Sequence, residues 1–173
     1  TLTGFAGSLL LFSLQSKRTG ATFEHIIHVE AALLGSLQEI DAQGLQTEQA
    51  TRNVVLNPAD KKAADNHDAA DVKFRKAMEA AQKLSTGEMA AQLAALPPLW
   101  DQSHALKLEV MALAREGRTA EATQLLNTRE TKLWREVKDV IQKAIDAQAK
   151  KSRAAFEDFK ARDASVFRNV LLL

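Results

Sequence analysis

The segment LQTEQATRNVVLNPAD, residues 45–60, decides how the rest of the chain is interpreted. It has the pattern of the last three turns of a long helix, followed by an abrupt stop at Asn57-Pro58. A proline disfavours the α conformation of the residue before it and suits the first position of a following helix. We expect Asp60 in the first turn of that next helix, where the helix dipole favours a carboxylate. The segment therefore predicts a sharp corner between two helices.

One basic side chain, Arg52, lies about a turn and a half before this corner, beside Gln49, Thr51 and Asn53. Small polar residues around a guanidinium predict an anion-binding site, because the planar arginine fork donates two parallel hydrogen bonds to a carboxylate. The alternative is that Arg52 is only an exposed charge near a helix end, or the partner of Glu48 four residues earlier.

The composition is that of one ordinary globular domain. The chain has 173 residues, 46% of them hydrophobic and 26% charged, with a net charge of +1. Seven glycines, three prolines and no tyrosine in an Ala-, Leu-, Lys- and Glu-rich chain predict an all-α fold. The balanced charge gives no reason to expect a nucleic-acid partner. The absence of cysteine excludes disulfides, thiolate metal sites and cysteine nucleophiles.

Hydrophobic spacing and helix breakers divide the chain into four predicted helices. The first ends at residue 56, the second spans about 59–84, the third ends near 115, and the fourth runs from 120 onward. Ser85 and Glu88 resemble a capping box, and Pro97-Pro98 predicts a kink or break in the third helix. At the last corner we expect Gly117 to end one helix and Thr119 to cap the next.

The four helices carry apolar series that predict their inward faces. The first helix repeats every seven residues and becomes small and polar near the corner, where it would admit water, a ligand or a second copy of the helix. Its series is Ile26, Leu33, Ile40, Thr47 and Val54, with Leu37 adjacent and Gly44 and Thr51 in the polar part. The second series is Ala63, Ala70, Val72, Ala77, Ala81 and Leu84, and the third is Leu96, Leu99, Leu106, Val110 and Leu113. The fourth is Leu126, Leu133, Val140, Ala147, Ala154 and Ala161.

Short turns between these helices predict an antiparallel up-down-up-down four-helix bundle. The outer helices, first and fourth, are longer than the inner two, so we expect both to project together beyond the bundle. Residues 1–14 and 166–173 are apolar, and the chain does not begin with methionine. We interpret both ends as membrane-proximal or truncated transmembrane segments; the alternative is ordinary core helix.

Motifs for catalysis and for cofactors are missing from the sequence. There is no nucleophile elbow, P-loop, GxGxxG or HExxH, so we expect neither an enzyme nor a bound cofactor. His25 and His28 have the spacing of a ligand pair but lack the Glu-x-x-His partners of a di-iron bundle. An acidic cluster with one histidine on the second helix predicts a solvated face: Asp65, His67, Asp68 and Asp71. The methionines Met78, Met89 and Met111 are typical core residues, although a haem-binding bundle is a further alternative.

Two stretches carry a resemblance to a known family. The Arg-Asn-hydrophobic-Asn-Pro corner at 52–58 and the later corner ALAREGRTAEA, residues 112–122, resemble the four-helix-bundle sensory domain of bacterial methyl-accepting chemotaxis proteins. The resemblance covers almost the whole chain and implies a single periplasmic domain, 1–173, of a homodimeric inner-membrane receptor. It also implies a ligand held near the membrane-distal end, across the dimer interface. Sensor histidine kinases share this domain.

In the aspartate-type receptors of that family, arginines of the first helix and a polar residue early in the fourth hold the ligand. Only Arg52 matches one of those arginines, and Gln43 and Glu48 stand at the other two positions. We therefore expect a different small carboxylate, a di- or tricarboxylic acid, whose binding displaces the fourth helix. The predicted ligand residues are Arg52, Asn53, Gln49, Thr51, Thr123, Asn127 and Arg129. The competing interpretation is a membrane-tethered helical scaffold without a small ligand.

Overall fold

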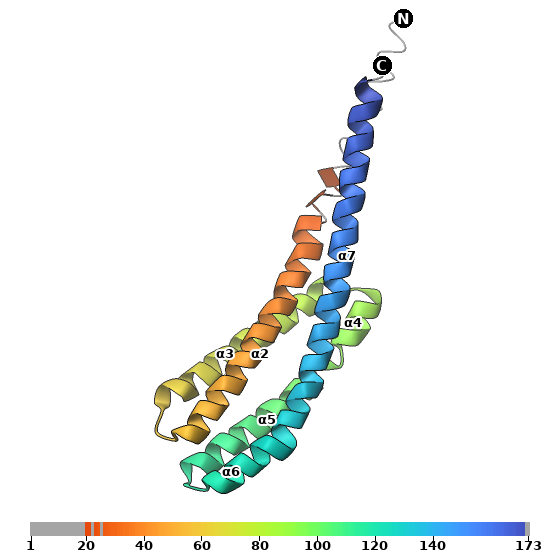
Figure 1. Ribbon diagram of the computed structural model, residues 1–173. Helices are drawn as coiled ribbons and strands as arrows, with labels where there is room; N and C mark the ends of the chain where they lie inside the picture. The colour runs from red at the N-terminus through yellow and green to blue at the C-terminus, as the bar shows by residue number, and fades with distance from the viewer. Residues whose placement is uncertain (1–19, 22, 25, 172–173) are drawn as a thin grey trace, which may run out of the picture. The chain divides into compact units, whose positions relative to one another are not determined.

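The computed structural model describes residues 20–21, 23–24 and 26–171, and the described residues contain helices and turns but no strand (Figure 1). This confirms the all-α prediction. The elements are η1 (Ile26–Ala31, a π-helical turn), α2 (Ala32–Leu56), α3 (Lys61–Leu84), α4 (Gly87–Leu93), α5 (Leu96–Arg115), α6 (Thr119–Leu125), η2 (Leu126–Glu130, also π-helical) and α7 (Thr131–Leu171). They group into four helical segments separated at 57–60, 85–86 and 116–118. The chain divides into two compact units: residues 33–146, and residues 1–32 with 147–173.

The corner after α2 forms where the sequence predicts it. Helix α2 ends at Leu56, and the Asn57 amide still donates to the Asn53 carbonyl at 2.8 Å. The next helix, however, begins at Lys61, so the prediction that Asp60 belongs to its first turn is wrong. Asp60 is the N-cap, and its carboxylate accepts from the Ala63 amide at 3.0 Å because the first amides of a helix have no carbonyl partner of their own.

The predicted capping box at Ser85 and Glu88 does not form. The Ser85 hydroxyl donates backward to the Gln82 carbonyl at 3.0 Å and so closes α3. Helix α4 begins at Gly87, whose φ of 57° is left-handed, and no side chain caps it. The break predicted at the two prolines is confirmed, because α4 ends at Leu93 and the prolines occupy the first turn of α5, where their missing amides cost little.

The corner between α5 and α6 is a Schellman motif. The Arg118 amide donates to the Leu113 carbonyl at 2.9 Å and the Gly117 amide to the Ala114 carbonyl at 3.1 Å. Gly117 adopts a φ of 78°, as this motif requires. Thr119 is the first residue of α6 rather than its N-cap, which corrects the prediction by one position. The motif places Arg118 at the cap position, with no side-chain hydrogen bond to the helix amides.

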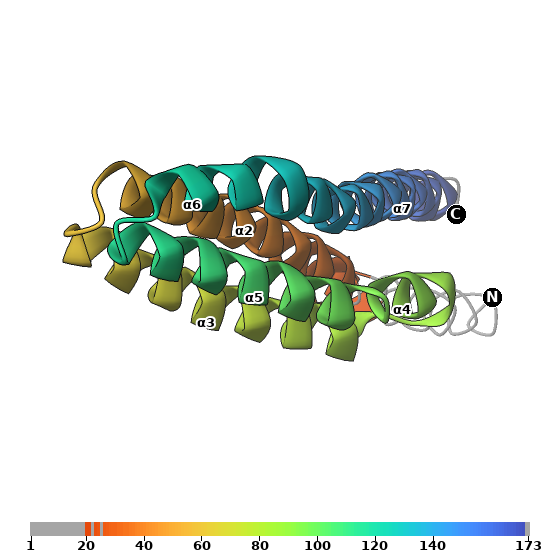
Figure 2. The ribbon, with the colours of Figure 1, turned by 90° about the horizontal axis from the view of Figure 1, so that it is seen from below.

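The interior of the unit 33–146 follows a spacing of alternately three and four residues on each helix. Helices α2, α3, α5 and α6 lie alongside one another in this unit (Figures 1 and 2). From Leu33 onward the series predicted for the first helix is confirmed, whereas the side chain of Ile26 lies outside those described. The buried residues of α2 include Leu33, Leu37, Ile40, Gly44, Thr47, Thr51 and Val54. The series of α3 is Ala63, His67, Ala70, Phe74, Ala77 and Ala81, and that of α5 is Leu96, Trp100, Ser103, Lys107, Val110 and Ala114.

The inward faces predicted for the second, third and fourth helices are each partly wrong. Val72 is 66% exposed, and Leu99, Leu106 and Leu113 are only half-buried because the aromatic and polar residues beside them take the interior positions. On the last helix the buried residues are Leu126, Glu130, Trp134, Val137, Ile141 and Ala144, whereas Leu133 and Val140 are half-buried and Ala147, Ala154 and Ala161 are exposed. A π-turn accommodates one extra residue, so η2 shifts the inward face of everything after it.

The small residue Gly44 makes room for an indole. A Cβ at this position would lie 2.4 Å from the Trp134 Cη2 atom and 2.8 Å from Cζ3. The Trp134 ring packs edge-on against Trp100, at 6.4 Å between ring centroids, and Trp100 stacks on Phe74 at 3.5 Å. At Gly44, therefore, the seam of α2 is filled by Trp134 of the same chain, and the expectation of water, a ligand or a second copy of the helix is wrong there.

The second unit joins the start of the described chain to the later part of α7. Glu30, 2% exposed in η1, accepts a hydrogen bond from the Gln148 side-chain amide at 2.6 Å and pairs with the Lys151 amine at 2.9 Å. The Phe23 and Phe159 rings contact each other at 5.4 Å between centroids. No helix among the described residues is long and apolar enough to cross a membrane. The predicted apolar ends, 1–14 and 166–173, lie outside the side chains described here, and the predicted projection of the outer helices stays a prediction.

Candidate functional site

The side chains predicted around the first corner fall into an exposed set and a buried one. Arg52 is 52% exposed, and its Nε atom lies 3.9 Å from the Glu48 Oε2 atom. Gln49 and Asn53 are exposed beside it. Thr51 is fully buried, and its hydroxyl donates to the Thr47 carbonyl at 2.8 Å. The helix itself uses the Thr51 hydroxyl, so the exposed candidates at this corner are Arg52, Gln49 and Asn53.

The side chains predicted on the last helix are all exposed, on α6 and η2. The Thr123 hydroxyl donates to the Thr119 carbonyl at 2.8 Å, and Asn127 faces solvent. Arg129 contributes to an open groove of about 560 Å³ between α5 and the start of α7. The groove is lined by both charge signs, with Arg129 and Lys132 opposite Glu109.

Between these two sets of residues lies a buried cluster of charges that the sequence did not predict. The Lys107 amine is fully buried and lies 2.9 Å from Glu48 Oε1 and 2.8 Å from Glu130 Oε1. It also donates to the Ser103 hydroxyl and sits over two indole rings, 5.0 Å from the centroid of Trp100 and 5.3 Å from that of Trp134. We call Glu48, Lys107 and Glu130 the buried triad.

The buried triad connects the two halves of the predicted site. Glu48 is the ion-pair partner of Arg52 on α2, and Glu130 follows Arg129 in η2. Both carboxylates contact one amine of α5, so Arg52 is linked to the core through Glu48. In a buried ion cluster the loss of hydration is unfavourable, and the attraction between opposite charges offsets it.

Burial also changes the acidity of one member of the triad. Burial above all, and then the nearby Glu130 carboxylate, raise the pKa of Glu48 from 4.5 to about 7, against the lowering effect of the Lys107 amine. The carboxyl of Glu48 therefore changes its charge near neutral pH, inside a buried cluster where an unpaired charge is destabilising.

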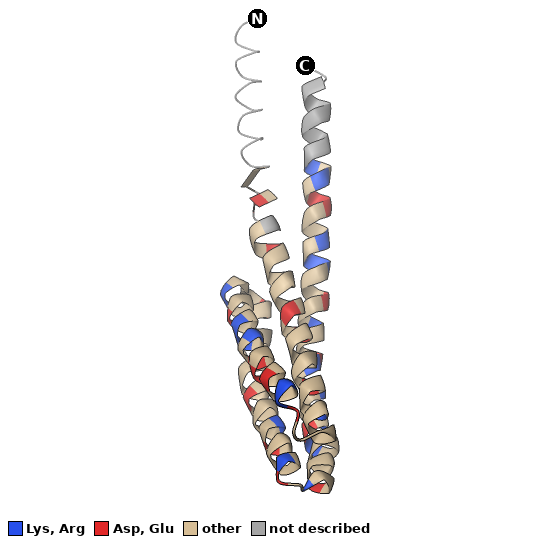
Figure 3. Ribbon diagram, turned by 90° about the vertical axis from the view of Figure 1, so that its left-hand side faces the viewer, with Lys and Arg blue, Asp and Glu red and all other residues tan. Residues whose placement is uncertain are grey.

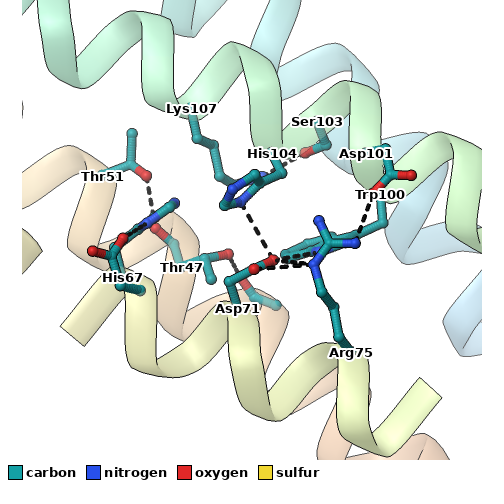
Figure 4. Close-up of polar contacts among 12 residues, drawn as sticks. Thr47, Thr51, His67, Asp71, Arg75, Trp100, Asp101, Ser103, His104 and Lys107 are labelled. Atoms are coloured by element: carbon teal, nitrogen blue, oxygen red, sulfur yellow. Dashed lines mark hydrogen bonds and ion pairs between the residues drawn. The ribbon is translucent and has the colours of Figure 1, made fainter. Parts of the chain in front are cut away.

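A second polar network, centred on Asp71, joins α3 to α5 (Figure 4). The Asp71 carboxylate accepts from the Trp100 indole at 2.7 Å and from the Arg75 guanidinium at 3.0 Å, and lies 3.3 Å from His104 Nδ1. Arg75 also pairs with Asp101 at 2.7 Å. Burial lowers the pKa of His104, against the raising effect of Asp71. This network orients Trp100, which in turn covers the Lys107 amine.

The predicted solvated face on α3 is wrong at two residues: Asp71, whose side chain is only 14% exposed, and His67. His67 is fully buried, stacks on His104 at 5.3 Å between centroids and contacts Asp68 through Nδ1 at 3.1 Å. Within the described range no group of three or more metal-binding side chains is placed to hold an ion. His28 is exposed, and His25 lies outside the described residues. Acidic and basic residues are interspersed along the described helices in the view of Figure 3.

Comparisons of the chain with protein-family models, with curated proteins and with solved structures find no match. Function must therefore be inferred from the chemistry of the Arg52 surface and of the buried triad beneath it.

Proposed function

We propose that this chain is the extracytoplasmic ligand-binding domain of a transmembrane chemoreceptor that senses a small di- or tricarboxylic acid. The proposed fold is an antiparallel up-down-up-down four-helix bundle whose long outer helices carry the signal. The observation that carries the proposal is the position of Glu48, which faces the exposed Arg52 on one side and the buried Lys107 on the other.

The geometry suits Arg52 to exchange its partner for an acid. At 3.9 Å its pair with Glu48 is loose, and a half-exposed pair of this kind contributes only ~0–1 kcal/mol. An incoming carboxylate can accept two parallel hydrogen bonds from the same guanidinium. Gln49 and Asn53 are exposed beside it and offer amide groups to a second carboxylate or a hydroxyl of the ligand.

The same contacts supply a route for the signal. An acid that pairs with Arg52 breaks the Arg52–Glu48 ion pair, so that Glu48 then pairs with Lys107 only. Lys107 also holds Glu130 of η2, the turn that leads directly into α7. A ligand that favours one arrangement of this cluster would shift α7 by about 1–2 Å, the size of helix displacement found in signalling transitions.

The remaining parts of the proposal follow from the resemblance in sequence. They are a homodimer with the ligand near the dimer interface, an inner-membrane location with this domain in the periplasm, and no enzymatic activity. A sensor histidine kinase with the same domain would use the same site. The scaffold alternative predicts no small-molecule ligand at all.

A thermal-shift panel tests the proposal. At least one di- or tricarboxylic acid should raise the melting temperature of the protein in a saturable way, because a ligand bound to the folded state alone stabilises it. Arg52→Ala should abolish that rise without changing helicity. Arg135→Ala is the matched control, since it removes an exposed arginine of α7 and should leave the rise in melting temperature unchanged. Absence of stabilisation by any acid would favour the scaffold, and a retained rise in Arg52→Ala would remove this residue from the site.

A further inference from the structure

The carboxylates of the buried triad outnumber its amine. Glu48 is 6% exposed and Glu130 and Lys107 are fully buried, so water does little to screen them. If every member is ionised, the cluster holds two negative charges and one positive. Arg52 approaches only one oxygen of Glu48, at 3.9 Å, from the solvent side. Charges that are not paired inside a protein are costly, and a carboxyl group avoids the cost by taking up a proton.

The hydrogen bonds of the triad are incomplete in the same place. Glu130 Oε1 lies 2.8 Å from the Lys107 amine and accepts from the Ser103 hydroxyl at 3.4 Å, but the buried Oε2 has no hydrogen-bond partner. Both oxygens of Glu48 are buried and lack a hydrogen-bond partner as well, although Oε1 is within ion-pair distance of Lys107. Buried acceptors without donors are rare in folded proteins, so these oxygens favour a carboxyl proton that one of the two side chains can donate.

We propose that Glu48 and Glu130 hold one proton between them at neutral pH, so that the interior of this domain contains a proton-binding site. The proton comes from solvent and forms an O–H bond on Glu48, which then donates to Glu130 Oε2. The Lys107 amine lies within ion-pair distance of both carboxyls and neutralises the remaining carboxylate. The shift of the Glu48 pKa to about 7 agrees with this arrangement.

The charged and titratable groups around Glu48 come from its own helix, from α5 and from η2. They are Lys107 of α5, Glu130 of η2 and Arg52 of α2 itself. Lys107 and Arg52 favour the ionised carboxylate, whereas Glu130 and burial favour the protonated form. Occupancy of the proton site therefore decides whether Arg52 has a carboxylate partner. The proton site does not require an organic acid at Arg52, although an acid bound there would shift its occupancy through Arg52.

Carboxyl-carbon NMR of the whole chain tests the proposal directly. Glu48 and Glu130 are followed from about pH 4 to about pH 9, the range that spans ordinary and raised carboxyl pKa values. We expect one proton to leave the pair with a midpoint near 7 instead of 4.5, and the chemical shifts of both carboxyls to respond to it. Two carboxyls that both titrate at or below 4.5 would overturn the proposal.

Two variants separate the shared proton from a general effect of burial. Arg52→Ala removes a positive charge that favours the ionised form, so the midpoint should move upward. Glu48→Gln, which keeps a neutral donor toward Glu130, should abolish the step near neutrality. Glu109→Gln, an exposed position on α5, should leave it in place. A step near pH 7 that persists in Glu48→Gln would assign the proton elsewhere and refute the site.

Discussion

Replacement of Lys107 by methionine tests how the buried triad is held together. Methionine has nearly the same length and shape, so the change removes a charge without opening a large cavity. It leaves Glu48 and Glu130 without the amine that lies 2.9 and 2.8 Å from them. It also removes the cation from above the Trp100 and Trp134 rings.

The magnitude follows from the burial of all three groups. Removal of one partner from a buried ion cluster costs ~3–5 kcal/mol, because the opposite charge stays buried and unpaired. Such a loss is a large part of the ~5–15 kcal/mol that stabilises an ordinary domain. We expect the cost at neutral pH to lie near the lower value, since the proton that Glu48 and Glu130 share leaves only one carboxylate unpaired when the amine is gone. The cost should shrink further in acid, where both carboxyls are neutral.

Urea unfolding followed by far-ultraviolet circular dichroism measures this cost. Lys107→Met should lower the unfolding midpoint strongly, and addition of Glu48→Gln and Glu130→Gln should restore much of it by making the cluster neutral. Lys132→Met is the control, because Lys132 is exposed on α7 and its replacement should change stability by less than ~0.5 kcal/mol. A Lys107→Met protein within about 1 kcal/mol of the parent at neutral pH would refute the description of this cluster.

Three further outcomes follow from other parts of the structure. Gly44→Ala places a Cβ 2.4 Å from the buried Trp134 ring and should lower the free energy of unfolding by a net ~1–2 kcal/mol. Gly35→Ala, with nothing within 4 Å, should raise it by up to ~1 kcal/mol, and equal effects in urea unfolding would contradict the packing. Because the pKa of Glu48 rises from 4.5 when unfolded to about 7 when folded, its contribution to stability is complete below pH 4.5 and is lost as the pH rises through 7. At ~1.4 kcal/mol per pKa unit this is a loss of about 3 kcal/mol, absent in Glu48→Gln, and a pH profile shared by both proteins would exclude Glu48 as its source. Asp60→Ala removes the cap of α3 and should cost ~0.5–2 kcal/mol in thermal or urea unfolding, a loss that Asp60→Asn should largely avoid.

The course of the first helix was predictable because its signals are local. A proline stop and a sustained seven-residue repeat both act within one helix, and α2 ends at Leu56 and buries Leu33, Ile40 and Val54 as that pattern indicates. On the last helix, the residues predicted to face inward lie one position before those that do. The repeat at Leu133 and Val140 assumes an uninterrupted α-helix, and the π-turn η2 accommodates an extra residue before it.

The buried triad was not predictable from a search for apolar periodicity. Lys107 stands at a core spacing on α5, between Ser103 and Val110, but a count of hydrophobic residues passes over it. The signal that could have found it is a lysine at an inward position of one helix together with Glu130 at an inward position of another. Only tertiary packing shows that these two charges meet, whereas the pairing of Arg52 with Glu48 followed from their separation of four residues.

The most direct measurement of the proposed function is a map of ligand contacts by amide NMR. The isotope-labelled chain is titrated with the acid that gives the largest thermal shift, or with the pooled panel if none stands out. We expect saturable chemical-shift changes at the amides of residues 48–56 and at the Arg52 side-chain Nε–H group, and smaller ones at the amides of η2. All of these changes should be lost in Arg52→Ala. Spectra that stay unchanged with every acid, or that change identically in the Arg52→Ala protein, would contradict a carboxylate site at this corner.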